Sequence, residues 1–253
     1  MYDAVLAETI TINGAEGDAI EAYAARPLQP GPLGGVVVIH HMPGYDRGSK
    51  EIVRRFAAEG YSAVCPNLYS REAPGAAPDD AAATARSLGG VPDERLVGDV
   101  AGAAAYLRGL PNSNGNVGVI GYCSGGRQSF LAGCSLDLQA AVDCYGAFVV
   151  EPTPEGFPLR TGPIGHLSEH LSCPLLGLFG AEDQHPSPAA TQELEGLLRK
   201  HGKEYEFHTF EDAGHAFFAV ERPAYRPAAA VEGWKLVLDF FGRNLAGTGT
   251  TAA

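Results

Sequence analysis

The chain of 253 residues has few cysteines, and they form no pattern that builds a metal site or a disulfide scaffold. Structural zinc sites and small disulfide-rich domains use paired, closely spaced cysteines. Here the cysteines are odd in number, irregularly spaced and without a C-x-x-C pair: Cys65, Cys123, Cys134, Cys144 and Cys173. We therefore expect reduced thiols, a cytoplasmic location and no bound metal.

Long apolar runs and an excess of basic residues are also missing. The longest apolar stretches, such as residues 34–39, have the length of a strand and are too short to cross a bilayer. The first residues contain no basic stretch followed by an apolar segment, so we expect no cleaved signal peptide. Lys and Arg number 18 against 30 Asp and Glu, and the net charge of −12 disfavours nucleic acid and anionic membranes as partners. A small molecule is the expected partner, and the sequence leaves the oligomeric state open.

Strand-like apolar runs alternate with stretches of helical period, which is typical of βαβ units. We expect a single α/β domain over residues 1–253, with a mostly parallel sheet and helices on both faces. Strands are predicted at 9–12, 19–25, 36–40, 62–65, 116–120, 140–145, 175–179 and 204–210, and helices at 49–59, 93–108, 126–133, 188–201 and 228–245. Residues 71–92 are expected to form a surface loop, 151–172 a loop or partial lid, and 247–253 a frayed tail.

The most informative motif is G-x-C-x-G at residues 121–125, between a predicted strand and a predicted helix. This arrangement is typical of a nucleophile elbow with cysteine in the position that serine usually holds. In so tight a turn, a Cβ at either flanking glycine would clash with its neighbours. The middle residue is then strained and its side chain is raised off the sheet. The free N–H groups of the following helix favour a thiolate and an oxyanion. A buried cysteine is also a common inert packing residue.

An acid and a histidine follow Cys123 in the chain order that this fold uses. Asp183 follows the strand at 175–179, and His215 follows the strand at 204–210. The carboxyl ends of parallel strands meet at one edge of the sheet, where such folds place their sites. His215 is predicted to take the thiol proton and return it to the leaving group, and an acid to fix its tautomer. Glu182 is a rival for the acid.

With these residues in view, the chain resembles the dienelactone hydrolase family over roughly residues 36–245. The segments that carry the resemblance are 60–61, 65–69, 121–126, Asp183 and 213–217. The resemblance implies an α/β-hydrolase fold, no cofactor, a cysteine nucleophile at Cys123 and Asp183 as the triad acid. It also implies an oxyanion hole made by backbone N–H groups of Ser124 and Met42.

The sequence departs from the family pattern at two positions. The family usually has a glutamate where this chain has His41, which is expected to support a standing thiolate or to line the pocket. Members that open dienelactones carry an arginine four residues after the triad histidine, where this chain has Ala219. The substrate-binding residues expected in addition to His41 are Tyr122, Arg71, Arg86 and His185.

The main hypothesis is therefore a cysteine-dependent hydrolase that cleaves an ester or lactone through an acyl-enzyme on Cys123. An acyltransferase or thioesterase on the same triad is the alternative within enzymes. A catalytically idle hydrolase fold that binds small molecules is the alternative from another class, and it predicts a broken triad. The natural substrate does not follow from the sequence.

Overall fold

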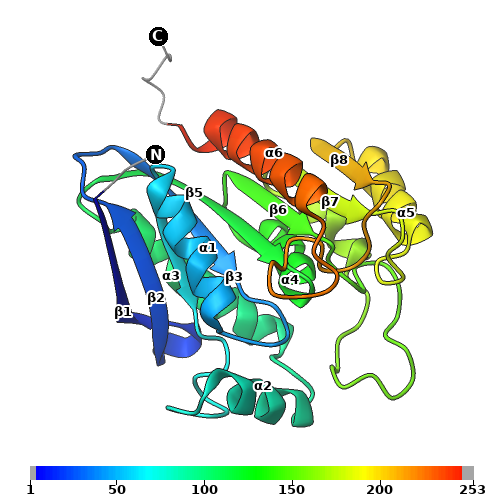
Figure 1. Ribbon diagram of the computed structural model, residues 1–253, viewed down its shortest axis with the longest axis horizontal. Helices are drawn as coiled ribbons and strands as arrows, with labels where there is room; N and C mark the ends of the chain where they lie inside the picture. Colours follow the sequence, from blue (N-terminus) through cyan, green and yellow to red (C-terminus); the bar gives the residue numbers. More distant parts are fainter. Residues whose placement is uncertain (1–3, 247–253) are drawn as a thin grey trace.

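A computed structural model describes residues 4–246, which form one eight-stranded sheet with helices on both faces (Figure 1). The strands are β1 Val5–Asn13, β2 Ala19–Pro27, β3 Leu33–Ile39, β4 Ser62–Pro66, β5 Ser113–Tyr122, β6 Ala140–Cys144, β7 Leu175–Gly180 and β8 Tyr205–Phe210. Their order across the sheet is β1-β2-β4-β3-β5-β6-β7-β8. The pairs β1–β2 and β2–β4 are antiparallel and the remaining pairs are parallel, so the expected mostly parallel sheet is confirmed.

Two helical layers bury the sheet. The α-helices are α1 Arg47–Ala58, α2 Pro78–Ser87, α3 Asp93–Arg108, α4 Ser124–Ser135, α5 Pro188–Lys200 and α6 Pro227–Leu245. One apolar cluster joins one face of the sheet to α3, α4 and α5, and a second joins the other face to α1 and α6. On β3, Val37 and Ile39 belong to the first cluster and Val36 and Val38 to the second. This alternation explains why all seven residues of β3 are apolar or glycine and buried.

Part of the segment expected to be a surface loop, residues 71–92, is helical instead. Helix α2 spans Pro78–Ser87, with Pro78 in its first turn followed by Asp79 and Asp80. Proline and acidic residues are favoured in a first helical turn, and the alanines that follow are strong helix formers. The prolines and glycines at the ends of the segment obscured this short helix.

Residues 151–164 contain no helix or strand, as expected, and a short 3-10 helix follows at Gly165–His170. The predicted frayed tail, 247–253, lies outside the described residues. Within residues 4–246, no helix combines the length and the apolar character that crossing a membrane requires.

The turn from β5 into α4 leaves no room for a side chain at its two glycines. Cys123 has φ 58° and ψ −121°, a conformation that L-residues rarely adopt. A Cβ on Gly121 would lie 1.8 Å from the Gly125 carbonyl oxygen, and a Cβ on Gly125 would lie 2.5 Å from the Ile39 carbonyl oxygen. Both glycines are therefore required sterically, because the obstructing atoms belong to backbone that has no room to move.

We expect Gly125→Ala to lower the free energy of unfolding by about 2–4 kcal/mol, because its methyl group meets the backbone of β3. Gly196→Ala is the matched control: Gly196 is exposed on α5, and a Cβ there has no neighbour within 4 Å. In the control, the free energy of unfolding is expected to rise by roughly 0.5–1 kcal/mol, because alanine has a higher helix propensity than glycine. Chemical denaturation of both variants checks this, and equal stability of Gly125→Ala and the wild type would contradict it.

Candidate active site

Cys123 lines a cavity of about 470 Å³ at the carboxyl edge of the parallel sheet. Asp183, after β7, and His215, after β8, line the same cavity. The strands β5, β6, β7 and β8 run parallel, so the loops that carry these residues leave the sheet at one edge. The structure therefore brings the three residues together as the sequence predicted.

His215 is held in one orientation by a buried carboxylate. Its Nδ1 lies 2.9 Å from Asp183 Oδ2, and the Asp183 side chain is only 2 % exposed. The other oxygen, Oδ1, accepts the backbone N–H of His185 at 2.9 Å. Glu182 lines the cavity but makes no hydrogen bond to His215, so the geometry favours Asp183 over its rival. With Nδ1 engaged, Nε2 is the imidazole atom left to interact with the sulfur.

The charges of the cysteine and the histidine stabilise each other. Burial alone would raise the pKa of the Cys123 thiol, but the hydrogen bond and charge of His215, together with the backbone N–H groups of Ser124 and Met42, outweigh it and lower the pKa below the ordinary 9.0. Burial alone would lower the pKa of His215, but its hydrogen bonds with Asp183 and Cys123 raise it to about 10. Both shifts favour a thiolate beside an imidazolium, the reactive state of a cysteine nucleophile.

Two backbone N–H groups face the sulfur and contribute to the lowered pKa of Cys123. One belongs to Ser124, the first residue of α4, and the other to Met42, which follows β3. The Tyr69 hydroxyl donates to the Met42 carbonyl oxygen at 3.0 Å and so fixes the loop that carries it. An oxyanion formed on a carbonyl next to Sγ would meet both N–H donors, as in an oxyanion hole.

His41 and His185, two of the expected substrate-binding residues, line the cavity. His41 Nε2 lies 2.7 Å from Asp46 Oδ2, while Asp46 Oδ1 caps α1 by accepting the Ser49 N–H at 2.8 Å. The His185 ring packs against Phe148 with ring centroids 5.2 Å apart. The histidine that replaces the family's glutamate is therefore itself paired with a carboxylate.

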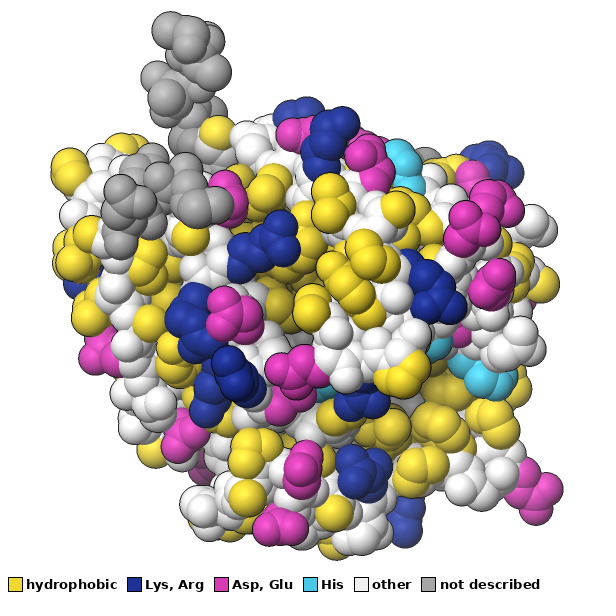
Figure 2. Space-filling model, in the orientation of Figure 1, with side chains coloured by type: hydrophobic (Ala, Val, Ile, Leu, Met, Phe, Trp, Pro, Cys, Tyr) yellow, Lys and Arg dark blue, Asp and Glu magenta, His cyan; other side chains and the backbone are white. Residues whose placement is uncertain are grey.

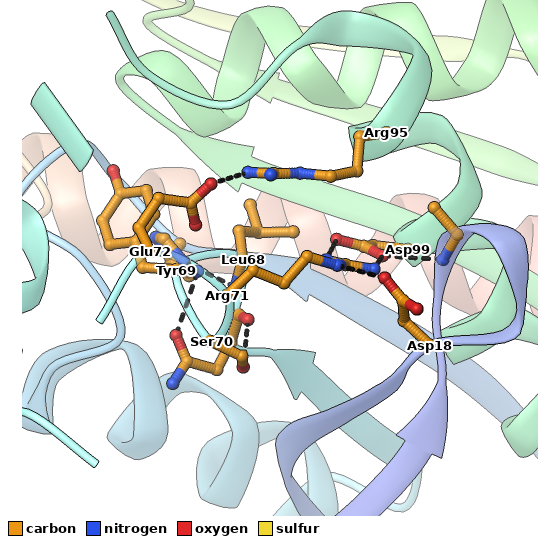
Figure 3. Close-up of polar contacts among 11 residues, drawn as sticks. Asp18, Leu68, Tyr69, Ser70, Arg71, Glu72, Arg95 and Asp99 are labelled. Carbon is orange, nitrogen blue, oxygen red and sulfur yellow. Dashed lines mark hydrogen bonds and ion pairs between the residues drawn. The ribbon is translucent and has the colours of Figure 1, made fainter. Parts of the chain in front are cut away.

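The other three expected substrate-binding residues are not among those that line this cavity. Arg71 donates to both oxygens of the buried Asp99 at 2.9 Å and to Asp18 at 2.7 Å, so its guanidinium is already neutralised (Figure 3). Arg86 lies in the last turn of α2. Tyr122 precedes the nucleophile on β5, and its ring points into the apolar cluster on the α6 side of the sheet.

Sequence reasoning missed Arg127, which is 3 % exposed and lines the cavity. Its guanidinium donates to both oxygens of Asp93 at 2.7 and 2.8 Å and to the Gly162 carbonyl oxygen at 2.7 Å. It thereby ties the elbow helix α4 to the start of α3 and to the 151–164 segment. The sequence feature that could have identified Arg127 is its position four residues after Cys123, because residues four apart lie on the same face of a helix.

A buried carboxyl beneath the site was also missed. Asp143, at the end of the neighbouring strand β6, is 1 % exposed, and burial raises its pKa to about 7. Its Oδ1 accepts the Gly146 N–H at 2.7 Å. That hydrogen bond closes the turn holding Tyr145, which has φ 45° and packs edge-to-face on the His215 ring at 5.2 Å. Asp143 therefore supports one wall of the site.

Comparison with known proteins identifies the family of this chain. The family model described as "Dienelactone hydrolase family" matches residues 20–245. A protein of Escherichia coli K12 named "Putative carboxymethylenebutenolidase" is 34 % identical over 245 residues, covering 94 % of this chain and 88 % of its own. The "Carboxymethylenebutenolidase" of Pseudomonas putida is 31 % identical over 244 residues, covering 93 % of this chain and 96 % of its own.

A solved structure from Klebsiella pneumoniae, titled a "Putative Dienelactone Hydrolase", superposes with a TM-score of 0.84 at 28 % identity, covering 95 % of this chain and all of its own. The eight-stranded sheet is thus the α/β-hydrolase fold that the resemblance implied. The chain belongs to the dienelactone hydrolase family and is a carboxylic ester hydrolase.

Proposed function

We propose that this protein hydrolyses a small ester or lactone through an acyl-enzyme on Cys123. His215 acts as the general base and acid, and Asp183 orients it. The observation that carries the proposal is the placement of Cys123, His215 and Asp183 in one cavity, with His215 Nδ1 2.9 Å from Asp183 Oδ2. The pKa values of Cys123 and His215, both shifted against the effect of burial, support it. A buried cysteine used only for packing would show the opposite shift.

In the first step, the Cys123 thiolate attacks the carbonyl carbon of the substrate. A C–S bond forms while the carbonyl π electrons move to oxygen, and the N–H groups of Ser124 and Met42 stabilise that negative charge. The intermediate then collapses and its C–O bond breaks. The imidazolium of His215 gives its proton to the departing alkoxide, which stays attached to the acyl group when the substrate is a lactone.

In the second step, water releases the acyl group. Neutral His215 takes a proton from water, and the hydroxide oxygen attacks the thioester carbon in the same oxyanion hole. The C–S bond breaks, the sulfur departs as the thiolate and the product leaves as the carboxylic acid. His215 keeps the proton that it took from water, so the thiolate–imidazolium pair is restored. Asp183 keeps Nδ1 occupied throughout, so that Nε2 exchanges the proton.

The walls of the cavity support a compact and largely apolar substrate. Phe148, Phe157 and Leu159 line one side, the last two from the 151–164 segment. His41 and His185 are proposed to contact the substrate at the rim. Two relatives carry names that refer to carboxymethylenebutenolide, a lactone, which makes a lactone the first substrate to test.

We further propose that the protein acts in the cytoplasm. All five of its cysteines are free, and each lies in the described part of the chain. Reduced thiols persist in a reducing compartment.

Replacing Cys123 by alanine is expected to lower kcat for p-nitrophenyl acetate and for a dienelactone by at least about 10³-fold, because the acyl-enzyme cannot form. Steady-state hydrolysis, with the fold checked by circular dichroism, measures this. Cys173→Ala is the matched control, since Cys173 is buried in the apolar cluster away from the cavity. Full activity in folded Cys123→Ala protein would refute the nucleophile assignment.

Asp183→Asn is expected to move the thiolate titration of Cys123 to higher pH. Without the carboxylate the pKa of His215 falls, so less imidazolium is present to stabilise the thiolate and the thiol pKa rises. The pH dependence of iodoacetamide alkylation at Cys123, followed by peptide mass spectrometry, reports the thiolate directly. The wild-type profile is expected to rise through a pKa below 9.0.

The control for this titration is Asp212→Asn, which removes the same charge from an exposed loop position three residues before His215. Its alkylation profile is expected to match that of the wild type. Identical profiles for Asp183→Asn and the wild type would show that Asp183 does not act on the Cys123–His215 pair.

A further inference from the structure

A second cavity of about 790 Å³ adjoins the first on the side of the sheet covered by α1 and α6. Its residues come from the start of β1, from α1, from the 218–222 segment and from α6. In Figure 2 it lies beside the Lys and Arg side chains that gather over α1. We call it the α1–α6 groove.

The walls of the α1–α6 groove are mainly apolar. Val5 and Ala7 of β1, Ile52 of α1, Phe218 and Trp234 form most of them. Apolar side chains around a concave site favour an apolar ligand. The groove therefore has room and lining for an aliphatic or aromatic body.

Three arginines line the groove without a carboxylate partner in residues 4–246: Arg47, Arg55 and Arg222. The Arg55 guanidinium stacks on the Trp234 ring at 3.9 Å, which leaves its N–H groups free to donate. Three carboxylates also line the groove, but Asp46 pairs with His41 and Glu51 with Arg54, so Glu221 is the one carboxylate that faces the three unpaired arginines without an ion pair in residues 4–246. Guanidinium groups bind carboxylates with two parallel hydrogen bonds.

Tyr122 gives a further indication that a polar group is missing. Its side chain lines the groove, yet its hydroxyl is buried and has no hydrogen-bond partner among the described residues. A buried hydroxyl without a partner is unfavourable.

The groove and the catalytic cavity share a wall. His41, Tyr145, Ala219 and Arg222 line both. A ligand in the groove therefore lies directly behind residues that face the Cys123 cavity. The two cavities remain distinct, since Arg47 and Trp234 line only the groove and Phe148 lines only the catalytic cavity.

We propose that the α1–α6 groove binds an apolar carboxylate, such as a medium-chain aliphatic acid. The chain of the ligand lies against Ile52, Phe218 and Trp234, and its carboxylate accepts hydrogen bonds from the unpaired arginines. This site goes beyond the proposed hydrolase activity and does not depend on it, because binding there requires no turnover at Cys123.

Trp234 makes the test direct, because it is the only tryptophan in the chain and it lines the groove. Octanoate is expected to change its fluorescence and to give a saturable binding heat by calorimetry. We expect 1-octanol to bind about tenfold more weakly, because it lacks the charge, and acetate to produce no change at the same concentrations, because it lacks the apolar chain. Absence of both a saturable emission change and a binding heat with octanoate would overturn the proposal, as would equal affinity for octanol.

Variants locate the ligand. Arg47→Gln is expected to weaken octanoate binding about fivefold and to leave octanol binding unchanged. It removes one cation, and Arg47 lines the groove but not the catalytic cavity. Arg199→Gln, an exposed charge on α5 paired with Glu195, is the matched control and is expected to bind as the wild type does. Phe148→Ala is also expected to bind normally. If Phe148→Ala weakens octanoate and Arg47→Gln does not, the acid occupies the catalytic cavity and the groove assignment is wrong.

Discussion

The active-site geometry depends on the turn between β5 and α4, where there is no room for an additional atom. Gly121 and Gly125 lie so close to neighbouring backbone that neither tolerates a Cβ, and Cys123 between them is held at positive φ. This strain persists because β5 and α4 are both buried between packed layers. The same turn places the sulfur above the sheet edge and the first N–H group of α4 beside it. The position of the Cys123 sulfur, the N–H donor beside it and the backbone strain at Cys123 therefore all follow from this one turn.

The other cysteines show how much the surroundings of Cys123 matter. Burial raises the pKa of Cys134 to about 12 and that of Cys173 to about 11, and it also raises the pKa values of Cys65 and Cys144. Cys123 is buried too, yet its pKa is lowered. The difference lies in the imidazole of His215 and the two backbone donors, because these favour the charged form against desolvation. The residue type alone does not distinguish the proposed nucleophile from four packing thiols.

The sequence predicted the parts of the site that follow from local geometry and chain order. The G-x-C-x-G turn, the acid after β7 and the histidine after β8 are fixed by where parallel strands end, and the structure gathers them at one edge. The surrounding arginines were harder to predict, because the partner of a long charged side chain is distant in sequence. Arg71 pairs with Asp99, 28 residues away, and Arg127 pairs with Asp93, 34 residues before it. Helix α2 was missed because the helix-favouring alanines and aspartates lie between prolines and glycines.

The two departures from the family pattern, at His41 and Ala219, meet in the wall between the two cavities. At position 41 an imidazole takes the place of the expected carboxylate, and this imidazole is hydrogen-bonded to Asp46. Ala219 presents a single methyl group where the resemblance led us to expect an arginine. Neither position supplies the nucleophile, the base or the oxyanion donors, so neither change removes a step of the proposed chemistry. Both residues line the catalytic cavity, so we expect them to affect which substrates fit there. The proposed hydrolysis therefore remains compatible with both departures, and His41 and Ala219 are the positions at which we expect substrate preference to differ from that of dienelactone-opening members.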